Sequence, residues 1–415
     1  MKLNSNSVVV IRMLACSSIA LTVAIAEPPR PLEPAKRGGP MPRNVSVPPG
    51  PPQQGDPLPG LNPNELSLFG EGLDEFEGVE AAESGLGPIF NNVSCVACHN
   101  SGGTGGGSAI LVTRFGRAAG GKFDPLAALG GSLLQDNAID PAVQEIIPAE
   151  ANVVAGRQST ALFGVGLIEA IPDEAILRNA TRTSIDGIRG KAAIVKDVAS
   201  GVSRVGRFGW KCQQATLLSF SADAYLNEMG ITSRFFPQEN APNGNLNLLA
   251  EYDKVADPED AINPDTGRSD VDASANFMRF LAPPQPLQLS PSASNGRQVF
   301  QAINCAVCHM PSMNTGPNAV RALDRKPVFL YSDLLLHDMG SLGDGIVQAA
   351  AGPREFRTAP LWGLRSSAPY LHDGRAPNVD QAIRLHDGEA KISRDRYLRL
   401  NATQRQQLLD FLKSL

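Results

Sequence analysis

The sequence predicts a mainly α-helical fold with long loops, divided into two domains. The clearest evidence is the last segment, where apolar residues recur at the i, i+3, i+4, i+7 spacing of one helix face. These residues are Leu408, Phe411, Leu412 and Leu415. Sustained alternation of apolar and polar residues, which a half-buried strand would show, is not evident. Forty glycines and 33 prolines beside only 6% aromatic residues indicate long loops around a modest core.

Two further patterns define individual helices. Thr403 and Gln406 match a capping box, which predicts that the last helix begins there. Val299, Phe300 and Ile303 form one helical face that runs into a segment containing two cysteines.

The first residues have the features of a secretory signal peptide. Lys2 and Arg12 precede an apolar stretch, residues 13–26, which ends in small residues before a Glu-Pro-Pro sequence. A membrane anchor is the alternative, but the stretch is short for the roughly 20 apolar residues of a span. We therefore expect residues 1–26 to direct export to the periplasm. No later segment is long and apolar enough to predict a membrane span.

Prolines mark the remaining boundaries. Residues 27–60 contain 12 prolines and no hydrophobic period, so we expect a disordered linker there. A second break is the Ala-Pro-Pro-Gln-Pro sequence at residues 282–286. The two expected folded domains are therefore residues 61–283 and residues 284–415.

The charge balance excludes one class of function. The 415 residues include 37 Lys and Arg against 42 Asp and Glu, giving a net charge of −5 without any long block of like charges. Proteins that bind nucleic acid carry a basic patch or stripe. We therefore expect no nucleic-acid partner.

A five-residue pattern occurs twice and indicates which cofactor the protein binds. Residues 95–99 (CVACH) and 305–309 (CAVCH) both read C-x-x-C-H, the attachment pattern of c-type haem. The two thiols can each bond one vinyl group of the porphyrin, and the adjacent histidine then reaches the iron. A Cys₄ zinc site and thioredoxin-like dithiols are alternatives, but neither needs a histidine after each pair. We expect two covalent haems, held by Cys95, Cys98, His99, Cys305, Cys308 and His309, in two cytochrome-c-like domains.

The second axial position of each iron distinguishes an electron carrier from a reactive site. Three further histidines all lie in the C-terminal domain: His337, His372 and His386. Between the two motifs there is no histidine, and the methionines there are Met229 and Met278. The N-terminal haem is therefore the candidate reactive site and the C-terminal haem the candidate electron relay.

Several segments outside the motifs resemble one family. They are residues 85–91 (GLGPIFN), 206–211 (GRFGWK), 227–230 (NEMG), 331–340 (YSDLLLHDMG) and 356–362 (FRTAPLW). These segments resemble the di-haem c-type oxidoreductases, often labelled thiol oxidoreductases, over about residues 60–415. That family is similar in turn to the bacterial di-haem cytochrome c peroxidases, and residues 369–375 (PYLHDGR) match theirs.

The resemblance implies roles for two residues of the N-terminal domain. Glu228 stands where the peroxidases carry a catalytic glutamate, which takes a proton from bound peroxide and returns it to the leaving oxygen. Trp210 precedes it at nearly the peroxidase spacing and resembles their tryptophan between the haems. An exposed helix charge for Glu228 and simple core packing for Trp210 remain the alternatives.

The resemblance also bears on the C-terminal haem. The peroxidases place a methionine ligand where this chain has His386, which favours His309 and His386 as the two iron ligands, with Met339 as the second choice. His337 and His372 are then expected to make supporting hydrogen bonds. Arg357 and Arg375 are candidate partners of the haem propionates.

A calcium ion is a further expectation that the resemblance allows. The relatives hold calcium between their domains, and the corresponding residues are Gln158, Ser367 and Pro369. They have asparagine at the first position, so this chain departs from the pattern there.

These features together predict an exported di-haem oxidoreductase. Electrons from a redox-protein donor would enter at the C-terminal haem, pass near Trp210 and reach the N-terminal haem, where peroxide or another small oxidant is reduced. One alternative is an enzyme that activates O₂ or oxidises a substrate at the same iron. Another is a pure electron-transfer cytochrome with both irons six-coordinate.

Overall fold

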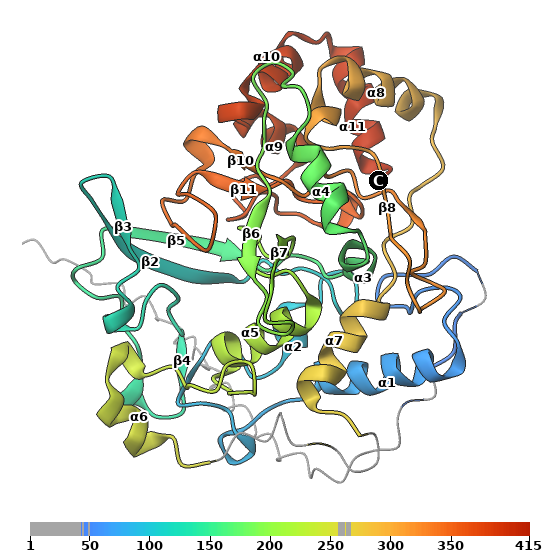
Figure 1. The fold of residues 1–415 in the computed structure, drawn as a ribbon. Helices are drawn as coiled ribbons and strands as arrows, with labels where there is room; N and C mark the ends of the chain where they lie inside the picture. Colours follow the sequence, from blue (N-terminus) through green and yellow to red (C-terminus); the bar gives the residue numbers. More distant parts are fainter. Residues whose placement is uncertain (1–42, 44, 49, 256–261, 263–266) are drawn as a thin grey trace, which may run out of the picture. The chain divides into compact units, whose positions relative to one another are not determined.

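Helices and small sheets are both prominent in this computed structural model (Figure 1). It describes residues 43, 45–48, 50–255, 262 and 267–415. The expected signal peptide, residues 1–26, lies outside the described residues, as does most of the first half of the expected linker. None of the helices in the described part of the chain has the length and apolar character that a membrane crossing requires.

The α-helices are α1 (Pro63–Glu77), α2 (Cys95–Cys98), α3 (Val165–Glu169), α4 (Asp173–Ala180), α5 (Leu217–Met229), α6 (Leu246–Tyr252), α7 (Asp270–Phe280), α8 (Pro291–Ala302), α9 (Val379–Leu385), α10 (Lys391–Arg399) and α11 (Ala402–Lys413). The strands are β1 (Ile89–Phe90), β2 (Leu111–Ala119), β3 (Lys122–Asp124), β4 (Asn137–Ala138), β5 (Val153–Gln158), β6 (Ala193–Lys196), β7 (Ser203–Gly206), β8 (Met313–Asn314), β9 (Pro327–Val328), β10 (Leu336–Asp338) and β11 (Glu355–Arg357).

The prediction of a mainly α fold is wrong, because the structure is 35% helix and 16% strand, with several small sheets. The largest sheet has the order β3-β2-β5 and is antiparallel, with Leu111 opposite Gln158. The other sheets pair two short strands each: β1 with β4, β6 with β7, β8 with β9 and β10 with β11.

The strands could not be recognised from the sequence, for a physical reason. Most are two to four residues long, too short to show a period of two. In β2, burial does not alternate, since Phe115 and Gly116 are adjacent and both buried while the last three residues are exposed. Without one buried face, the alternating pattern that identifies a strand is missing.

Helices pack in two groups that position the haem motifs. In the first group, α7 packs against both α1 and α5, and α1 also touches α2, which carries the first motif (Figure 1). In the second group, α8 packs against α11 and leads into the second motif. Leu408, Phe411 and Leu412 form one buried face of α11, and Leu415, two residues beyond its end, is buried as well.

The start of α11 differs from the prediction by two residues. The N-cap is Asn401, whose side chain accepts a hydrogen bond from the Gln404 backbone N–H at 2.9 Å. The Gln404 side chain in turn accepts from the Asn401 N–H at 3.2 Å. The capping box therefore exists, but it uses Asn401 and Gln404 rather than Thr403 and Gln406.

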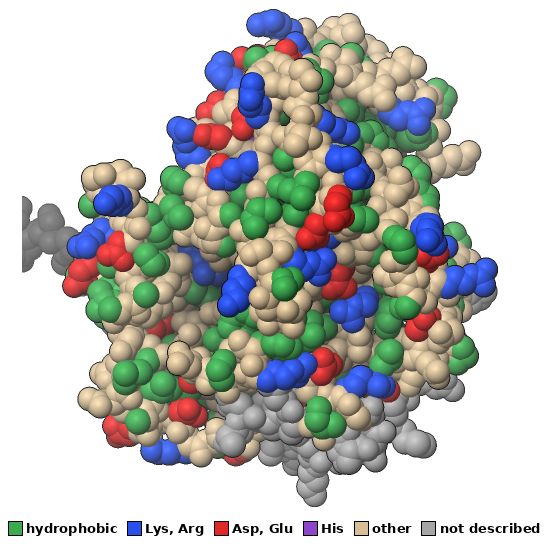
Figure 2. All heavy atoms as spheres, in the orientation of Figure 1, with side chains coloured by type: hydrophobic (Ala, Val, Ile, Leu, Met, Phe, Trp, Pro, Cys, Tyr) green, Lys and Arg blue, Asp and Glu red, His purple; other side chains and the backbone are tan. Residues whose placement is uncertain are grey.

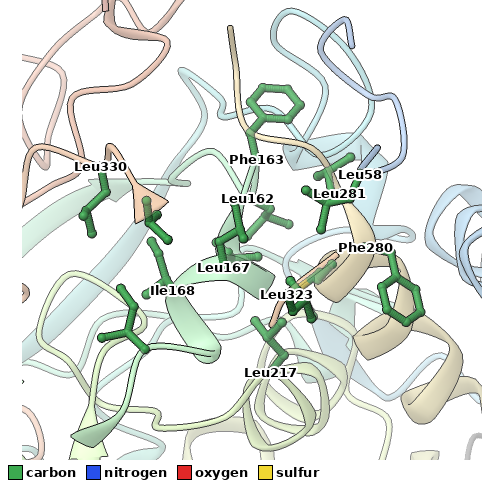
Figure 3. Packing of buried hydrophobic residues seen from close by; sticks show 14 of the residues in the cluster. Leu58, Leu162, Phe163, Leu167, Ile168, Leu217, Phe280, Leu281, Leu323 and Leu330 are labelled. Carbon is green, nitrogen blue, oxygen red and sulfur yellow. The ribbon is translucent and has the colours of Figure 1, made fainter. Parts of the chain in front are cut away.

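The main hydrophobic core includes residues on both sides of the proline break at 282–286. Leu162, Leu217 and Phe280 from the first expected domain are buried in one cluster with Leu323 and Leu330 from the second (Figure 3). The last part of the proline-rich segment joins this core, since Leu58 is buried and its N–H donates to the Phe280 carbonyl at 2.7 Å. The division into residues 61–283 and 284–415 stays a prediction.

Charges are mixed on the visible surface. On the face drawn in Figure 2, Lys and Arg side chains are interspersed with Asp and Glu, and no continuous basic stripe crosses it.

Candidate haem-binding sites

The first motif forms the short helix α2, which ends at the motif histidine, His99. Ser94 caps α2, its hydroxyl accepting from the Ala97 N–H at 3.3 Å. His99 ends the helix, and its Nδ1 lies 2.9 Å from the Gly106 carbonyl oxygen. That carbonyl requires a donor, so Nδ1 carries the proton and Nε2 is the nitrogen that would bind a metal. Burial lowers the pKa of His99, and backbone contacts with Gly106 and Thr160 partly offset this effect.

The glycine run after the first motif supports His99. The Gly105 N–H donates to the His99 carbonyl at 2.8 Å, and the Gly106 carbonyl accepts from the imidazole. A Cβ added at Gly106 would lie 2.0 Å from the Ser101 carbonyl oxygen, which is impossibly close. The loop therefore needs glycine to bring its backbone behind the histidine.

The second motif repeats this arrangement. Cys305 begins a single 3₁₀ turn after α8, and the His309 N–H donates to the Cys305 carbonyl at 2.9 Å. His309 Nδ1 lies 3.1 Å from the Tyr331 carbonyl oxygen. Its Nε2 is therefore also the free ring nitrogen, and burial lowers the pKa of His309 to about 4, which keeps the ring neutral.

His386 faces His309 from the end of α9. Its Nδ1 lies 2.7 Å from the Ala382 carbonyl oxygen, and its ring centroid is 6.5 Å from that of His309. A metal bound at about 2.0 Å by Nε2 of both rings would need centroids about 6.4 Å apart. Burial lowers the pKa of His386 as well. The spacing and the neutral rings suit one iron between two imidazoles.

A cavity of about 330 Å³ adjoins this histidine pair. Its wall extends from Ser101 and Gly107, in the loop after the first motif, to Cys305, Cys308 and the second-motif histidine. The lining is largely apolar, as expected for a site that buries a porphyrin.

Of the two arginines expected to pair with haem propionates, Arg357 is better placed than Arg375. Arg357 lines the cavity, is buried, and donates through Nε to the Gly209 carbonyl at 3.0 Å. Within the described residues no acidic side chain pairs with it, and burial lowers its pKa. A buried guanidinium of this kind suits a carboxylate ligand. Arg375 instead pairs with Asp373 and is largely exposed.

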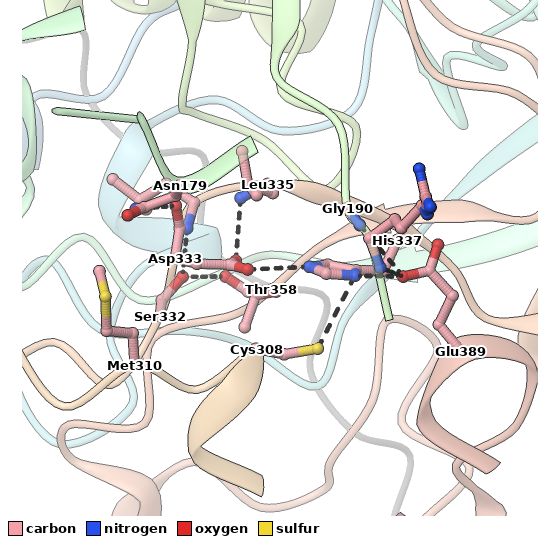
Figure 4. A network of polar contacts seen from close by, with 12 residues as sticks. Asn179, Gly190, Cys308, Met310, Ser332, Asp333, Leu335, His337, Thr358 and Glu389 are labelled. Carbon is pink, nitrogen blue, oxygen red and sulfur yellow. Dashed lines mark hydrogen bonds and ion pairs between the residues drawn. The ribbon is translucent and has the colours of Figure 1, made fainter. Parts of the chain in front are cut away.

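His337 is held on both ring nitrogens (Figure 4). Nε2 lies 3.0 Å from Asp333 Oδ2 and Nδ1 lies 2.8 Å from Glu389 Oε2. Burial disfavours the imidazolium, but the hydrogen bonds to Asp333, Cys308 and Glu389 outweigh it and raise the pKa of His337 well above its usual value. A cation with two carboxylate partners is not available as an iron ligand.

Trp210 lies beside His372 on the cavity wall. The indole N–H donates to the Gln158 carbonyl at 2.8 Å, which fixes the ring. Its ring meets His372 edge-on at 6.3 Å, and His372 stacks on Phe356 at 4.2 Å. Burial lowers the pKa of His372 to about 4. The three rings form an aromatic group on the wall that joins the two motif regions.

Glu228 lies near the first motif at the end of α5. The Asn91 amide donates to Glu228 Oε2 at 2.9 Å, and the Asn91 backbone N–H donates to the Glu228 carbonyl at 2.8 Å. The carboxylate is close enough to Cys98 to raise the pKa of that thiol, after the larger effect of burial. Glu228 is therefore not an exposed helix charge; burial raises its own pKa, partly offset by Arg114.

Two neighbours of Glu228 were missed from the sequence. Arg114 on β2 interacts with Glu228 and Asp223, and its buried Nε has no hydrogen-bond partner among the described residues. Asp223 lies on α5 beside them, and burial raises its pKa to about 6. Asp223 could have been noticed from its position on the Glu228 helix, but Arg114 comes from a strand that was not predicted.

The expected calcium position is occupied by an amide. Gln158 Nε2 donates to the carbonyls of Pro369 and Leu371 at 2.8 and 3.0 Å. A cation would need the amide oxygen and these carbonyls to point at one place. Gln158 Oε1 is buried and has no hydrogen-bond partner among the described residues, so turning the amide would point its oxygen at the same place as the two carbonyls, and these three oxygens suit calcium.

The four motif cysteines do not gather into a zinc site. Among the described residues, the one group of three potential metal ligands within mutual reach is Cys308, Asp333 and His337, which contains a cysteine of only the second motif. Both nitrogens of His337 are already hydrogen-bonded.

Comparison with known families identifies the class of protein. Residues 142–415 match a family described as "Di-haem oxidoreductase, putative peroxidase". The chain belongs to this family, which confirms the family resemblance and the prediction of an oxidoreductase enzyme with two haems. The second motif lies inside the matched stretch, and the first motif precedes it.

Curated proteins give no match in sequence. Among solved structures, the di-haem peroxidase BthA of Burkholderia thailandensis is 13% identical, with 84% of this chain and 86% of that chain covered and a TM-score of 0.38. A MauG-like protein associated with microbial copper homeostasis is 16% identical, with 61% of this chain and 89% of that chain covered and a TM-score of 0.31. Hydrazine synthase of Kuenenia stuttgartiensis is 20% identical, with 35% of this chain covered and a TM-score of 0.26. The match covers 55% of that chain, about half of its length.

Proposed function

We propose that this di-haem oxidoreductase is an exported c-type peroxidase with one electron-relay site and one reactive site. The observation that carries the proposal is an asymmetry between the two motifs. Both present a histidine Nε2, but a second imidazole faces only His309, at 6.5 Å between ring centroids. Under the proposal, the haems are bonded to Cys95 and Cys98 and to Cys305 and Cys308, with His99, His309 and His386 as iron ligands.

When bound, the two haems supply the redox chemistry, the C-terminal one taking electrons from a donor and the N-terminal one passing them to peroxide. The protein contributes positions and protons. Trp210 is the candidate bridge between the sites, because its ring is fixed by the bond to Gln158 and lies on the wall that joins the two motif regions.

Glu228 is the candidate acid and base at the reactive site. In this role it accepts a proton from peroxide and returns it to the leaving oxygen, so that water departs rather than hydroxide. Asn91 orients the carboxylate, and Arg114 favours its ionised form. The partly buried position of Glu228 near Cys98 supports this assignment.

Location and partners follow from the same proposal. The signal-like residues 1–26 and the haem-attachment motifs support export to the periplasm. The electron donor is a redox protein and the acceptor is peroxide or another small oxidant. Neither nucleic acid nor a membrane span is part of the proposal.

We also propose that a calcium ion can bind at Gln158, because its buried Oε1 has no hydrogen-bond partner among the described residues and two backbone carbonyls face the same amide. Exhaustive treatment with EGTA should lower the melting temperature of the holoenzyme, and added Ca²⁺ should restore it. An unchanged melting temperature would contradict the calcium site.

Two measurements test the proposed function. The intact mass of denatured protein should exceed the polypeptide mass by two haems, and each Cys→Ser pair in one motif should remove one of them. Steady-state assays with peroxide, O₂ and a reduced cytochrome should show peroxide-dependent oxidation of the donor. Turnover with O₂ alone would indicate an oxygen-activating enzyme, and no turnover with either oxidant would indicate an electron carrier.

A further inference from the structure

A buried tyrosine lies against the first motif and is hydrogen-bonded to a carboxylate. Tyr225 on α5 is 2% exposed, and its hydroxyl donates to Glu75 Oε1 on α1 at 2.6 Å. Ser274 on α7 lies 3.0 Å from the same hydroxyl. Three helices thus meet at one phenol, whose proton has an immediate acceptor.

The tyrosine is next to the haem-attachment cysteine. Tyr225 belongs to a buried cluster against which Cys95 packs, and the two groups interact electrostatically. The negative charge of Glu75 reaches Cys95 as well, where burial and then Glu75 raise the pKa of the thiol. A cofactor bonded to Cys95 would therefore lie beside the phenol ring.

The surroundings of Tyr225 favour loss of an electron. Removing an electron from a neutral phenol leaves a strongly acidic cation, so oxidation becomes far easier when the proton leaves at the same time to a nearby base. Glu75 is that base, and its carboxylate accepts the phenol hydrogen bond directly. Negative charge stabilises an electron-deficient ring.

Tyr397 provides an internal contrast. It is fully buried and also donates to a carboxylate, that of Asp380. However, two guanidinium groups lie over its ring, Arg384 at 5.8 Å and Arg405 at 5.5 Å. These cations disfavour loss of an electron, so the same hydrogen bond does not make Tyr397 oxidisable.

We propose that Tyr225 is a redox-active tyrosine that supplies one electron to the N-terminal site while its proton moves to Glu75. The inference rests on the proposed peroxidase function, because peroxide is the oxidant. Reduction of H₂O₂ to two waters breaks the O–O bond and consumes two electrons and two protons. When the C-terminal site is already oxidised, one of these electrons would come from the N-terminal haem and the other from Tyr225. The phenol proton moves to Glu75, so Tyr225 becomes a neutral radical beside protonated Glu75, and the two protons that the waters require come from solvent.

The test is electron paramagnetic resonance of frozen holoenzyme after mixing with H₂O₂. Fully oxidised enzyme should give a radical signal that narrows when the five tyrosines carry ring deuterium. Enzyme that has first been reduced by a small-molecule reductant should give little of this signal. Peroxide consumption is measured in the same samples.

Three variants decide whether Tyr225 is the source. Tyr225→Phe should abolish the tyrosyl signal, and Tyr397→Phe should leave it intact. Glu75→Gln keeps the phenol but loses its charged proton acceptor, so the radical yield should fall by about tenfold or more, as expected for a lost bond to a charged group. The haem absorption spectrum of each variant shows whether both sites are still formed.

The outcomes separate this inference from the function on which it rests. Peroxide that is consumed without a tyrosyl signal, or with a signal that persists in Tyr225→Phe, overturns the inference and leaves the peroxidase proposal standing. If peroxide is not consumed at all, both are rejected.

Discussion

At the residue scale, the chemistry of each site depends on which histidine nitrogen is occupied. Gly106 and Tyr331 engage Nδ1 of His99 and His309 through backbone carbonyls, so both histidines offer Nε2. His337, expected to make supporting hydrogen bonds, has both ring nitrogens engaged by carboxylates. Spacing in the sequence could pair His386 with the second motif, but the hydrogen bonds that select it are visible only in the fold.

Glu228 gives a prediction at the same scale. Replacing it with glutamine should lower the peroxide turnover number by about 10²–10⁴-fold, the usual contribution of a general acid or base, while both haems stay attached. Steady-state kinetics and the haem absorption spectrum check the two parts. Unchanged turnover would remove Glu228 from the mechanism.

Arg114 should control the pH dependence of that turnover. The base form of Glu228 is needed, so activity should fall as the pH drops through its pKa, which burial holds above the ordinary carboxyl value. Arg114 lowers this pKa, and Arg114→Met should therefore move the acid limb of the kcat/KM profile to higher pH. The matched control, Arg117→Met, changes an exposed arginine on the same strand that pairs with Asp124. A limb that stays in place in Arg114→Met would contradict the assignment.

At the scale of the element, the loop after the first motif is built for one purpose. Its glycines allow the Gly106 carbonyl to reach His99. Any side chain at residue 106 would clash with the Ser101 carbonyl. The glycine run is visible in the sequence, but the contact of the Gly106 carbonyl with His99 is not. Likewise, the periodicity of α11 is evident from its apolar residues, whereas its true cap, Asn401, depends on backbone angles.

Gly106→Ala tests the role of this loop. Its new Cβ would clash with the Ser101 carbonyl, at a cost of about 1–3 kcal/mol or more, and the loop would have to move away from His99. We expect the bound haem per chain to fall from two toward one, with loss at the first motif. Gly120→Ala controls for backbone strain alone, since its φ of +57° disfavours alanine while its Cβ meets no atom within 4 Å. Equal haem content in both variants would show that the loop is not needed.

At the scale of the whole molecule, buried polar contacts join the two expected domains. Asp344 is fully buried between Arg157 at 2.6 Å and Lys211 at 3.1 Å, and the Gln158 amide reaches Pro369 and Leu371. The family resemblance places Gln158 near Pro369, but the contacts of Asp344 could not be predicted, because they connect residues far apart in sequence. What was predictable was local: the motifs, the last helix and the family segments.

Asp344→Asn should destabilise the protein strongly. It would leave Arg157 and Lys211 as buried cations without their carboxylate, which costs about 3–5 kcal/mol in comparable pairs. The free energy of unfolding from chemical denaturation is the measurement. The exposed pair of Arg117 and Asp124 supplies the control, since Asp124→Asn should cost about 0–1 kcal/mol. Similar losses in both variants would contradict the structural role of the buried group.

Cyanide titration of the oxidised holoenzyme, followed by electron paramagnetic resonance, tests most directly whether one iron alone is open. We predict two haem signals, of which the one from the His309 and His386 site stays low-spin and unchanged while the other is converted by cyanide. His386→Ala should make the second site respond as well. Two signals that both ignore cyanide, or both respond to it in the unaltered protein, would contradict the division into a relay site and a reactive site.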